Sequence, residues 1–87
     1  MEQITIQLSG KELIVKQSFR SLMLFEEMTG RNVNQLNDSL SDILTLLYCM
    51  LKASNKKNFI YSFDEFIDEI DLNPEIPVVF TEFLQSN

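Results

Sequence analysis

The chain has 87 residues, a net charge of −6 and a hydrophobic fraction of 45%. This length is near the lower limit for folding on one core, so we expect a single domain over residues 1–87. Histidine is absent and the two glycines stand far apart, which removes the commonest acid–base group and any glycine-rich phosphate loop. We therefore expect a binding protein, not an enzyme, with no cofactor and no metal.

Charge is distributed unevenly along the chain. Residues 1–57 hold all seven basic residues and six acids, whereas residues 58–87 hold seven acids and no base. Nucleic acids and anionic membranes both require basic surface, so we expect neither as a partner. The acidic, alternating N-terminus has no secretory pattern, so we expect a cytoplasmic protein.

The first segment predicts a β-hairpin over about residues 3–16. Apolar and polar residues alternate on both sides of Ser9-Gly10, which is typical of two short strands joined by a tight turn. An isolated hairpin is marginally stable in water, so its apolar face should lie on the helices that follow. The residues of that face are Ile4, Ile6, Leu8, Leu13 and Val15.

A first helix is predicted over about residues 19–29, between a Ser18 N-cap and a stop at Gly30. A polar loop follows it. A second helix is predicted over about residues 39–53, where Ser39 and Asp42 match a capping signature.

The second helix is apolar nearly all round, so it must be covered on more than one side. Either it is the centre of a tight bundle, or one of its faces is kept for a partner. If one face is kept for a partner, a stripe of this helix (Leu46, Cys49, Met50 and Ala53, its second apolar stripe) would line a groove. Two residues of the first helix, which lie away from its Phe19–Met23 side, would complete that groove. These candidate partner-binding residues are Leu24, Met28, Leu46, Cys49, Met50 and Ala53. Cys49 is more simply a buried packing residue, because nothing around it in the sequence would activate a thiol.

Two further helices complete the chain, over about residues 63–71 and 75–85. Ser62 and Glu65 form a capping box for the third helix, and Pro77 must lie in the first turn of the fourth. The predicted fold class is α+β, with an N-terminal hairpin packed on a small bundle of three to four helices.

The third helix has an acidic face opposite its apolar stripe. Carboxylates at i, i+4 spacing are ligands for hard cations, but a continuous helix offers few convergent ligands. We expect a solvated or partner-facing surface and no metal site. Nearly all aromatic residues fall on inward stripes, and the core where the third and fourth helices meet should contain Phe63, Phe66, Phe80 and Phe83.

The order of these patterns resembles a known family. A hairpin precedes an F-x-x-L-x-x-F helix that ends in T-G (Phe19–Gly30), then a long apolar helix, then the segment Ser62–Asp68. This arrangement, over about Ile4–Leu72, resembles the small tail assembly chaperones of long-tailed bacteriophages and prophages. The resemblance implies a protein that binds the tape measure protein and keeps it soluble until tail-tube subunits polymerise around it. It also implies that some members have a longer frameshifted form that recruits the tail-tube subunit, and we expect that this chain can form homo-oligomers.

Two other classes stay open. The acids at 64–71, 75 and 82 could make the chain an acidic DNA mimic that inhibits a host nuclease or regulator. A small metal-dependent enzyme is the third class, and a divalent ion would then raise its thermal stability.

Overall fold

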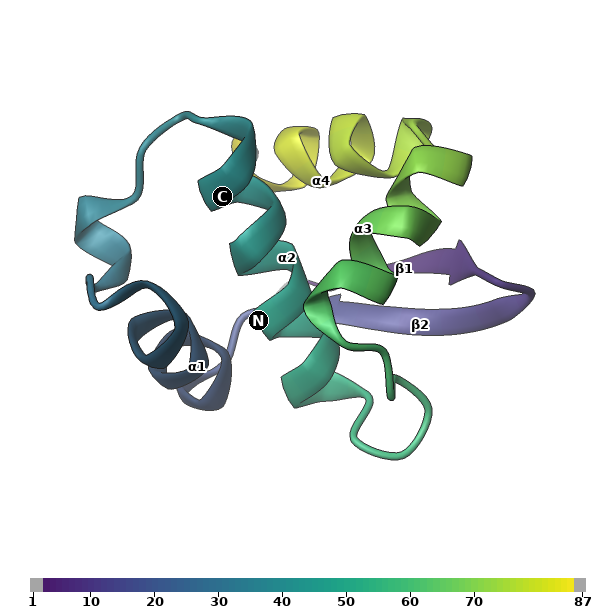
Figure 1. The fold of residues 1–87 in the computed structure, drawn as a ribbon, viewed down its shortest axis with the longest axis horizontal. Helices are drawn as coiled ribbons and strands as arrows, with labels where there is room; N and C mark the ends of the chain where they lie inside the picture. Colours follow the sequence, from purple (N-terminus) through teal and green to yellow (C-terminus); the bar gives the residue numbers. More distant parts are fainter. Residues whose placement is uncertain (1–2, 86–87) are drawn as a thin grey trace.

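The computed structural model describes residues 3–85, as a two-stranded sheet followed by four α-helices and one short 3-10 helix. This α+β architecture is the predicted fold class. Figure 1 shows α2 through the middle of the molecule, with α1 on one side, α3 and the hairpin on the other, and α4 across the top. The elements are β1 (Gln3–Leu8), β2 (Lys11–Lys16), α1 (Phe19–Thr29), η1 (Val33–Gln35), α2 (Leu40–Ser54), α3 (Phe63–Leu72) and α4 (Glu75–Gln85).

The hairpin lies where it was predicted, with its turn at Ser9-Gly10. The strands are antiparallel, with Ile6 opposite Leu13, and the strand residues that face the helices are buried, apart from the half-buried Ile4. Ser9 and Gly10 both have positive φ, 52° and 77°, as a type I′ turn requires. The hydroxyl of Ser9 donates a hydrogen bond to the carboxylate of Glu69, which ties the turn to α3.

The helices begin and end close to the predicted positions, and their caps explain why. The side chains of Ser18 and Ser62 each accept a hydrogen bond from the main chain three residues later, and both caps are reciprocated. Gly30 ends α1 with a left-handed φ of 73°. Ser39 caps α2 in the same way, but the carboxylate of Asp42 contacts Arg31 and Asn37.

The central helix α2 contacts α1, β2, α3 and α4. Its residues from Leu44 to Leu51 are all buried. Of the two arrangements that its apolar sequence allowed, the structure therefore has the first, in which the helix is the centre of the bundle. Its covering is complete except along one edge, which is described below.

The aromatic residues of α3 pack on α2. The Tyr48 ring lies 5.3 Å from that of Phe63 and 5.5 Å from that of Phe66, between ring centroids. Phe59, in the loop before α3, completes this cluster. As expected, Phe66 belongs to one buried core cluster with Phe80 and Phe83 of α4; α4 also packs on α2, and its Phe80 and Phe83 rings contact one another. Phe63 is only half-buried.

Candidate functional site

An apolar groove runs along the incompletely covered edge of α2, and we name it the α2 groove. Its cavity volume is about 310 Å³. Residues of α2 line it together with residues from α1, η1 and the following loop, and from the C-terminal half of α4. The lining residues are Leu22, Val33, Leu36, Ile43, Leu46, Met50, Thr81 and Leu84, with the polar residues Gln17, Asp38 and Gln85.

The segment of Val33 and Leu36 is held in place by an ion pair. The Arg31 guanidinium donates to both carboxylate oxygens of Asp42, at 2.8 and 2.7 Å, and also to the carbonyl of Gln35 at 2.8 Å. The main-chain N–H of Asn37 donates to the same carboxylate at 2.9 Å. This network therefore fixes the loop between α1 and α2 against the first turn of α2.

The ion pair keeps Asp42 ionised. The hydrogen bonds from Arg31, and then that from Asn37, lower the pKa of the Asp42 carboxyl to about 2, although its burial opposes this change. Because carboxylates are the acceptors that bind guanidinium bidentately, the loop stays anchored at any pH well above this value.

The lining of the α2 groove suits the binding of apolar groups. Among its lining residues only Asp38 carries an ionisable side chain. General acid–base chemistry needs titratable groups positioned against a substrate, whereas an apolar lining with a few polar groups suits apolar side chains of a partner.

The structure brings two of the six candidate partner-binding residues into the α2 groove. Leu46 and Met50 line it, although both are almost fully buried beneath its surface. The predicted second stripe is therefore mostly core, and only one edge of it faces a free space. The groove residues that sequence reasoning missed are Ile43 on α2 itself and, on other elements, Leu22, Val33, Leu36 and Leu84.

The other candidates lie at the contact between α1 and α2 or beside it. The sulfur atoms of Met28 and Cys49 are 3.6 Å apart, and Leu24 packs against the core. Burial, with a smaller effect of the Glu27 charge, raises the pKa of the Cys49 thiol to about 11. Cys49 is thus an unreactive packing residue, and half-buried Ala53 is absent from the groove lining.

Helix α1 is turned differently from what the sequence suggested. Its Phe25 and Ser21 are fully buried, and the half-buried Leu24 and the partly exposed Met28 lie beside them at the edge of the core. Phe19 is 87% exposed and Met23 is 56% exposed. Phe19 is therefore an exception to the expectation that the aromatic residues point inward.

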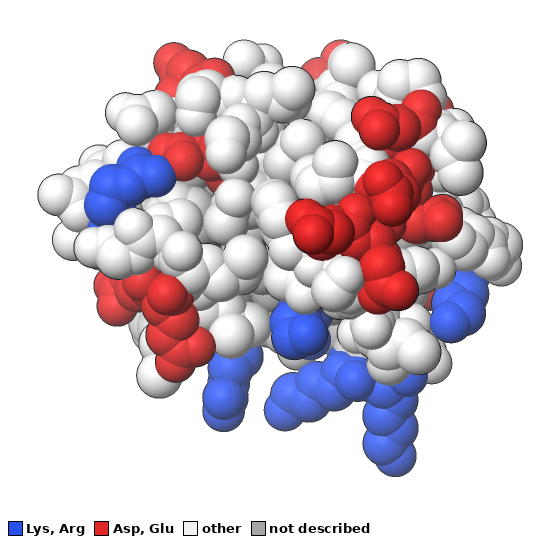
Figure 2. Space-filling model, in the orientation of Figure 1, with Lys and Arg blue, Asp and Glu red and all other residues white. Residues whose placement is uncertain are grey.

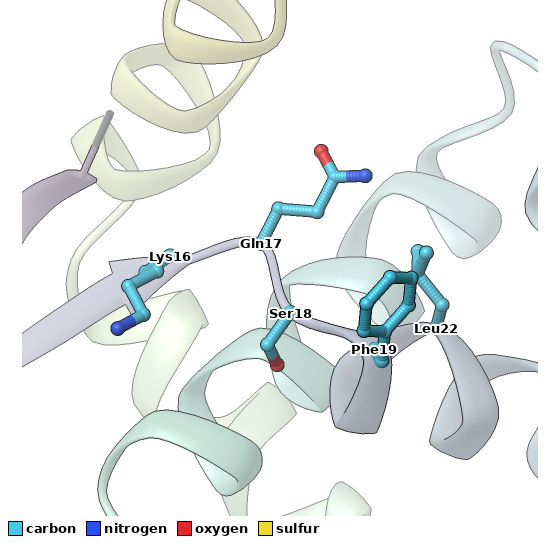
Figure 3. A pocket seen from close by; sticks show the side chains of 5 residues that line it. All are labelled: Lys16, Gln17, Ser18, Phe19 and Leu22. Carbon is cyan, nitrogen blue, oxygen red and sulfur yellow. The ribbon is translucent and has the colours of Figure 1, made fainter. Parts of the chain in front are cut away.

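A second hollow lies at the start of α1 and shares two residues with the α2 groove. Its cavity volume is about 340 Å³. In Figure 3 the Phe19 and Leu22 side chains lie side by side, while Lys16 and Gln17 extend from the chain that leads into the helix. The exposed apolar surface of α1 thus adjoins the groove.

The acids of α3 form an exposed patch. Figure 2 shows them gathered over α3, apart from the basic side chains along the lower edge. Within residues 3–85, no three acidic or cysteine side chains are grouped so that they could hold a metal ion. The acidic residues of this helix are Asp64, Glu65, Asp68, Glu69 and Asp71.

Comparison of the chain with protein-family models, curated proteins and solved structures finds no match. In the described part of the chain, no helix is both long and apolar enough to cross a membrane. The function must therefore be argued from the surfaces above.

Proposed function

We propose that this protein is a non-enzymatic helix-binding chaperone, of the kind that holds the tape measure protein during phage tail assembly. The single observation that carries the proposal is the α2 groove, an apolar channel bordered by three separate parts of the chain. The order of elements, which resembles that of tail assembly chaperones, supplies the client.

The groove fits the apolar face of an amphipathic helix. In helix-in-groove recognition, residues at i, i+3, i+4 and i+7 of the ligand enter an apolar channel. A volume of about 310 Å³ accommodates only a few side chains of such a stripe. Its walls come from α1 with η1 and from α4, so a bound helix would contact segments from both sides of α2 in the sequence while lying on α2.

The composition of the groove suits a client of variable sequence. Leucine, isoleucine, valine and methionine side chains provide most of its lining, and methionine adapts its shape to different apolar partners. Lining of this kind selects for an apolar stripe and discriminates little between individual side chains.

The test is titration of the full chain with synthetic amphipathic segments of the tape measure protein encoded beside it, followed by calorimetry. Leu36→Asp and Leu84→Asp place a charge in the groove at half-buried positions. Each should weaken the binding of a segment at least about tenfold. Met50→Asp is unsuitable, because Met50 is 1% exposed and a charge there would unfold the core.

Ile60→Asp is the matched control. Ile60 is 75% exposed in the loop before α3, so this variant introduces the same charge away from the groove and should bind normally. If no segment of the tape measure protein binds, or if Ile60→Asp weakens binding as much as Leu84→Asp does, the proposal is wrong.

The acidic patch supports a second candidate, an inhibitor that occupies the nucleic-acid site of a nuclease or regulator. Four of its acids, Asp64, Glu65, Asp68 and Asp71, are exposed, and Glu69 is half-buried beside Ser9 (Figure 2). Charge reversal of Asp64, Asp68 and Glu69 would abolish that activity, whereas a groove-binding chaperone should tolerate the same changes. Inhibition assays with a panel of host nucleases would distinguish the two functions.

A further inference from the structure

Helix α1 carries an apolar face that nothing within the described chain covers. Phe19 and Met23 are one turn apart and are the most exposed apolar residues of this helix. A phenylalanine that is 87% exposed contributes nothing to the core and favours association, because burial of its ring would be stabilising. This face points away from α2, opposite Phe25 and Ser21.

Charges beside this face are arranged in a self-complementary way. Arg20 and Glu27 are seven residues apart, so they lie on one flank of the helix, two turns from one another. Both are exposed, and the single ion pair among residues 3–85 is that of Arg31 with Asp42. Met23 lies almost midway between them.

We propose that the protein forms a symmetric dimer through antiparallel pairing of α1 with α1 of a second copy. In an antiparallel pair, residues of the same flank face each other across the two-fold axis, so Arg20 of each copy meets Glu27 of the other. The axis passes close to Met23, and each Phe19 packs against the second turn and the end of the partner helix. Such an interface is isologous, with one patch used twice.

The dimer is weak and leaves the α2 groove open. Interfaces that bury less than roughly 1,200 Å² are usually transient. A pair of helices of eleven residues each buries less than this. Leu36 and Leu84, on the other walls of the groove, are not part of the interface. The inference therefore does not depend on the proposed function.

Sedimentation velocity over a dilution series of the full chain, up to its solubility limit, tests the dimer. We expect a monomer–dimer equilibrium in the wild type. Met23→Glu places two like charges at the axis and should raise the dissociation constant at least about tenfold. Because Met23 is exposed, the variant should keep its helical circular dichroism and its thermal midpoint.

Charge reversal then tests the orientation of the helices. Arg20→Glu and Glu27→Arg each create two repulsive pairs and should weaken the dimer, whereas the double variant exchanges the two charges and should restore it. Glu12→Arg is the matched control, since Glu12 is exposed on β2, outside α1, and its reversal should change the dissociation constant little.

Three results would overturn the proposal. The wild type could remain a monomer at every concentration, or the dimer could ignore Met23→Glu, or the double charge variant could be as weak as the two single variants. If Phe19 and Met23 became buried only when an amphipathic helix was added, this face of α1 would bind the client and not a second copy.

Discussion

The side-chain amide of Asn55 pairs with the main chain of Ile14, forty-one residues earlier. Its oxygen accepts a hydrogen bond from the Ile14 N–H at 3.0 Å, and its nitrogen donates to the Ile14 carbonyl at 2.8 Å. The same nitrogen donates to the carbonyl of Leu51 at 2.9 Å. Asn55 thus satisfies the outer edge of β2 as a neighbouring strand would, and it joins the end of α2 to the hairpin.

Loss of this side chain should destabilise the fold. Asn55 is 8% exposed, so Asn55→Ala leaves polar main-chain groups of β2 and α2 without partners and should cost about 1–3 kcal/mol of unfolding free energy. Urea denaturation measures it. Asn58→Ala, on the exposed turn that follows, is the control and should change stability by less than about 0.5 kcal/mol. Equal stabilities of the two variants would contradict the role given to Asn55.

The pair of Arg31 and Asp42 predicts a specific dependence of stability on pH. The pKa of Asp42 is lowered to about 2 in the folded chain, compared with roughly 4 for an unperturbed aspartate. The contribution of the ion pair to folding stability is therefore complete above the pKa of Asp42 in the unfolded chain. It is lost as the pH falls toward the pKa of Asp42 in the folded chain. The stability difference between wild type and Asp42→Asn should be largest near pH 7 and shrink toward pH 2.

Denaturant midpoints measured between pH 7 and pH 2 provide this comparison. Asp38→Asn is the control, because Asp38 is exposed in the same loop and its variant should follow the wild type at every pH. A constant difference between wild type and Asp42→Asn over the whole range would show that the ion pair contributes no pH-dependent stability.

Cys49 should be inert in the folded protein. Its thiol is fully buried and its pKa is raised to about 11, so the thiolate that reacts with disulfide reagents is scarce at pH 8. We expect an aromatic disulfide reagent to label Cys49 only as fast as the protein opens, and at once in denaturant. Rapid labelling under native conditions would mean that α1 separates readily from α2.

Two phenylalanines of α1 test how this helix is oriented. Phe25 is fully buried and Phe19 is 87% exposed. Phe25→Ala should therefore cost about 3–5 kcal/mol of unfolding free energy, and Phe19→Ala less than about 0.5 kcal/mol when measured on dilute monomer. If the two costs were reversed, α1 would present its other face to the core.

Much of the fold follows from local signals. Capping residues and helical spacing predicted every α-helix to within one residue at either end, because the caps satisfy main-chain groups that only helix ends leave free. The position of the turn at Ser9-Gly10 could also be predicted from the local sequence, since few residue pairs accept two positive φ angles.

The orientation of α1 was harder to predict, because apolar residues stand on both of its sides. The charged residues Arg20, Glu26 and Glu27 mark its outer face and were the available signal. No local signal marked the α2 groove, whose walls come from segments more than forty residues apart. The pairing of Asn55 with Ile14 is equally non-local, and a single sequence holds no trace of it.

The central position of α2 also determines what a broken chain could do. Leu47 and Leu51 are buried in α2, which contacts β2 and α1 as well as α3 and α4, so removal of the C-terminal half would expose part of its apolar surface. A protease that cuts in the exposed turn around Lys56 and Lys57 would release two fragments with matching apolar faces. Such fragments should be much less stable when separated and regain stability when mixed.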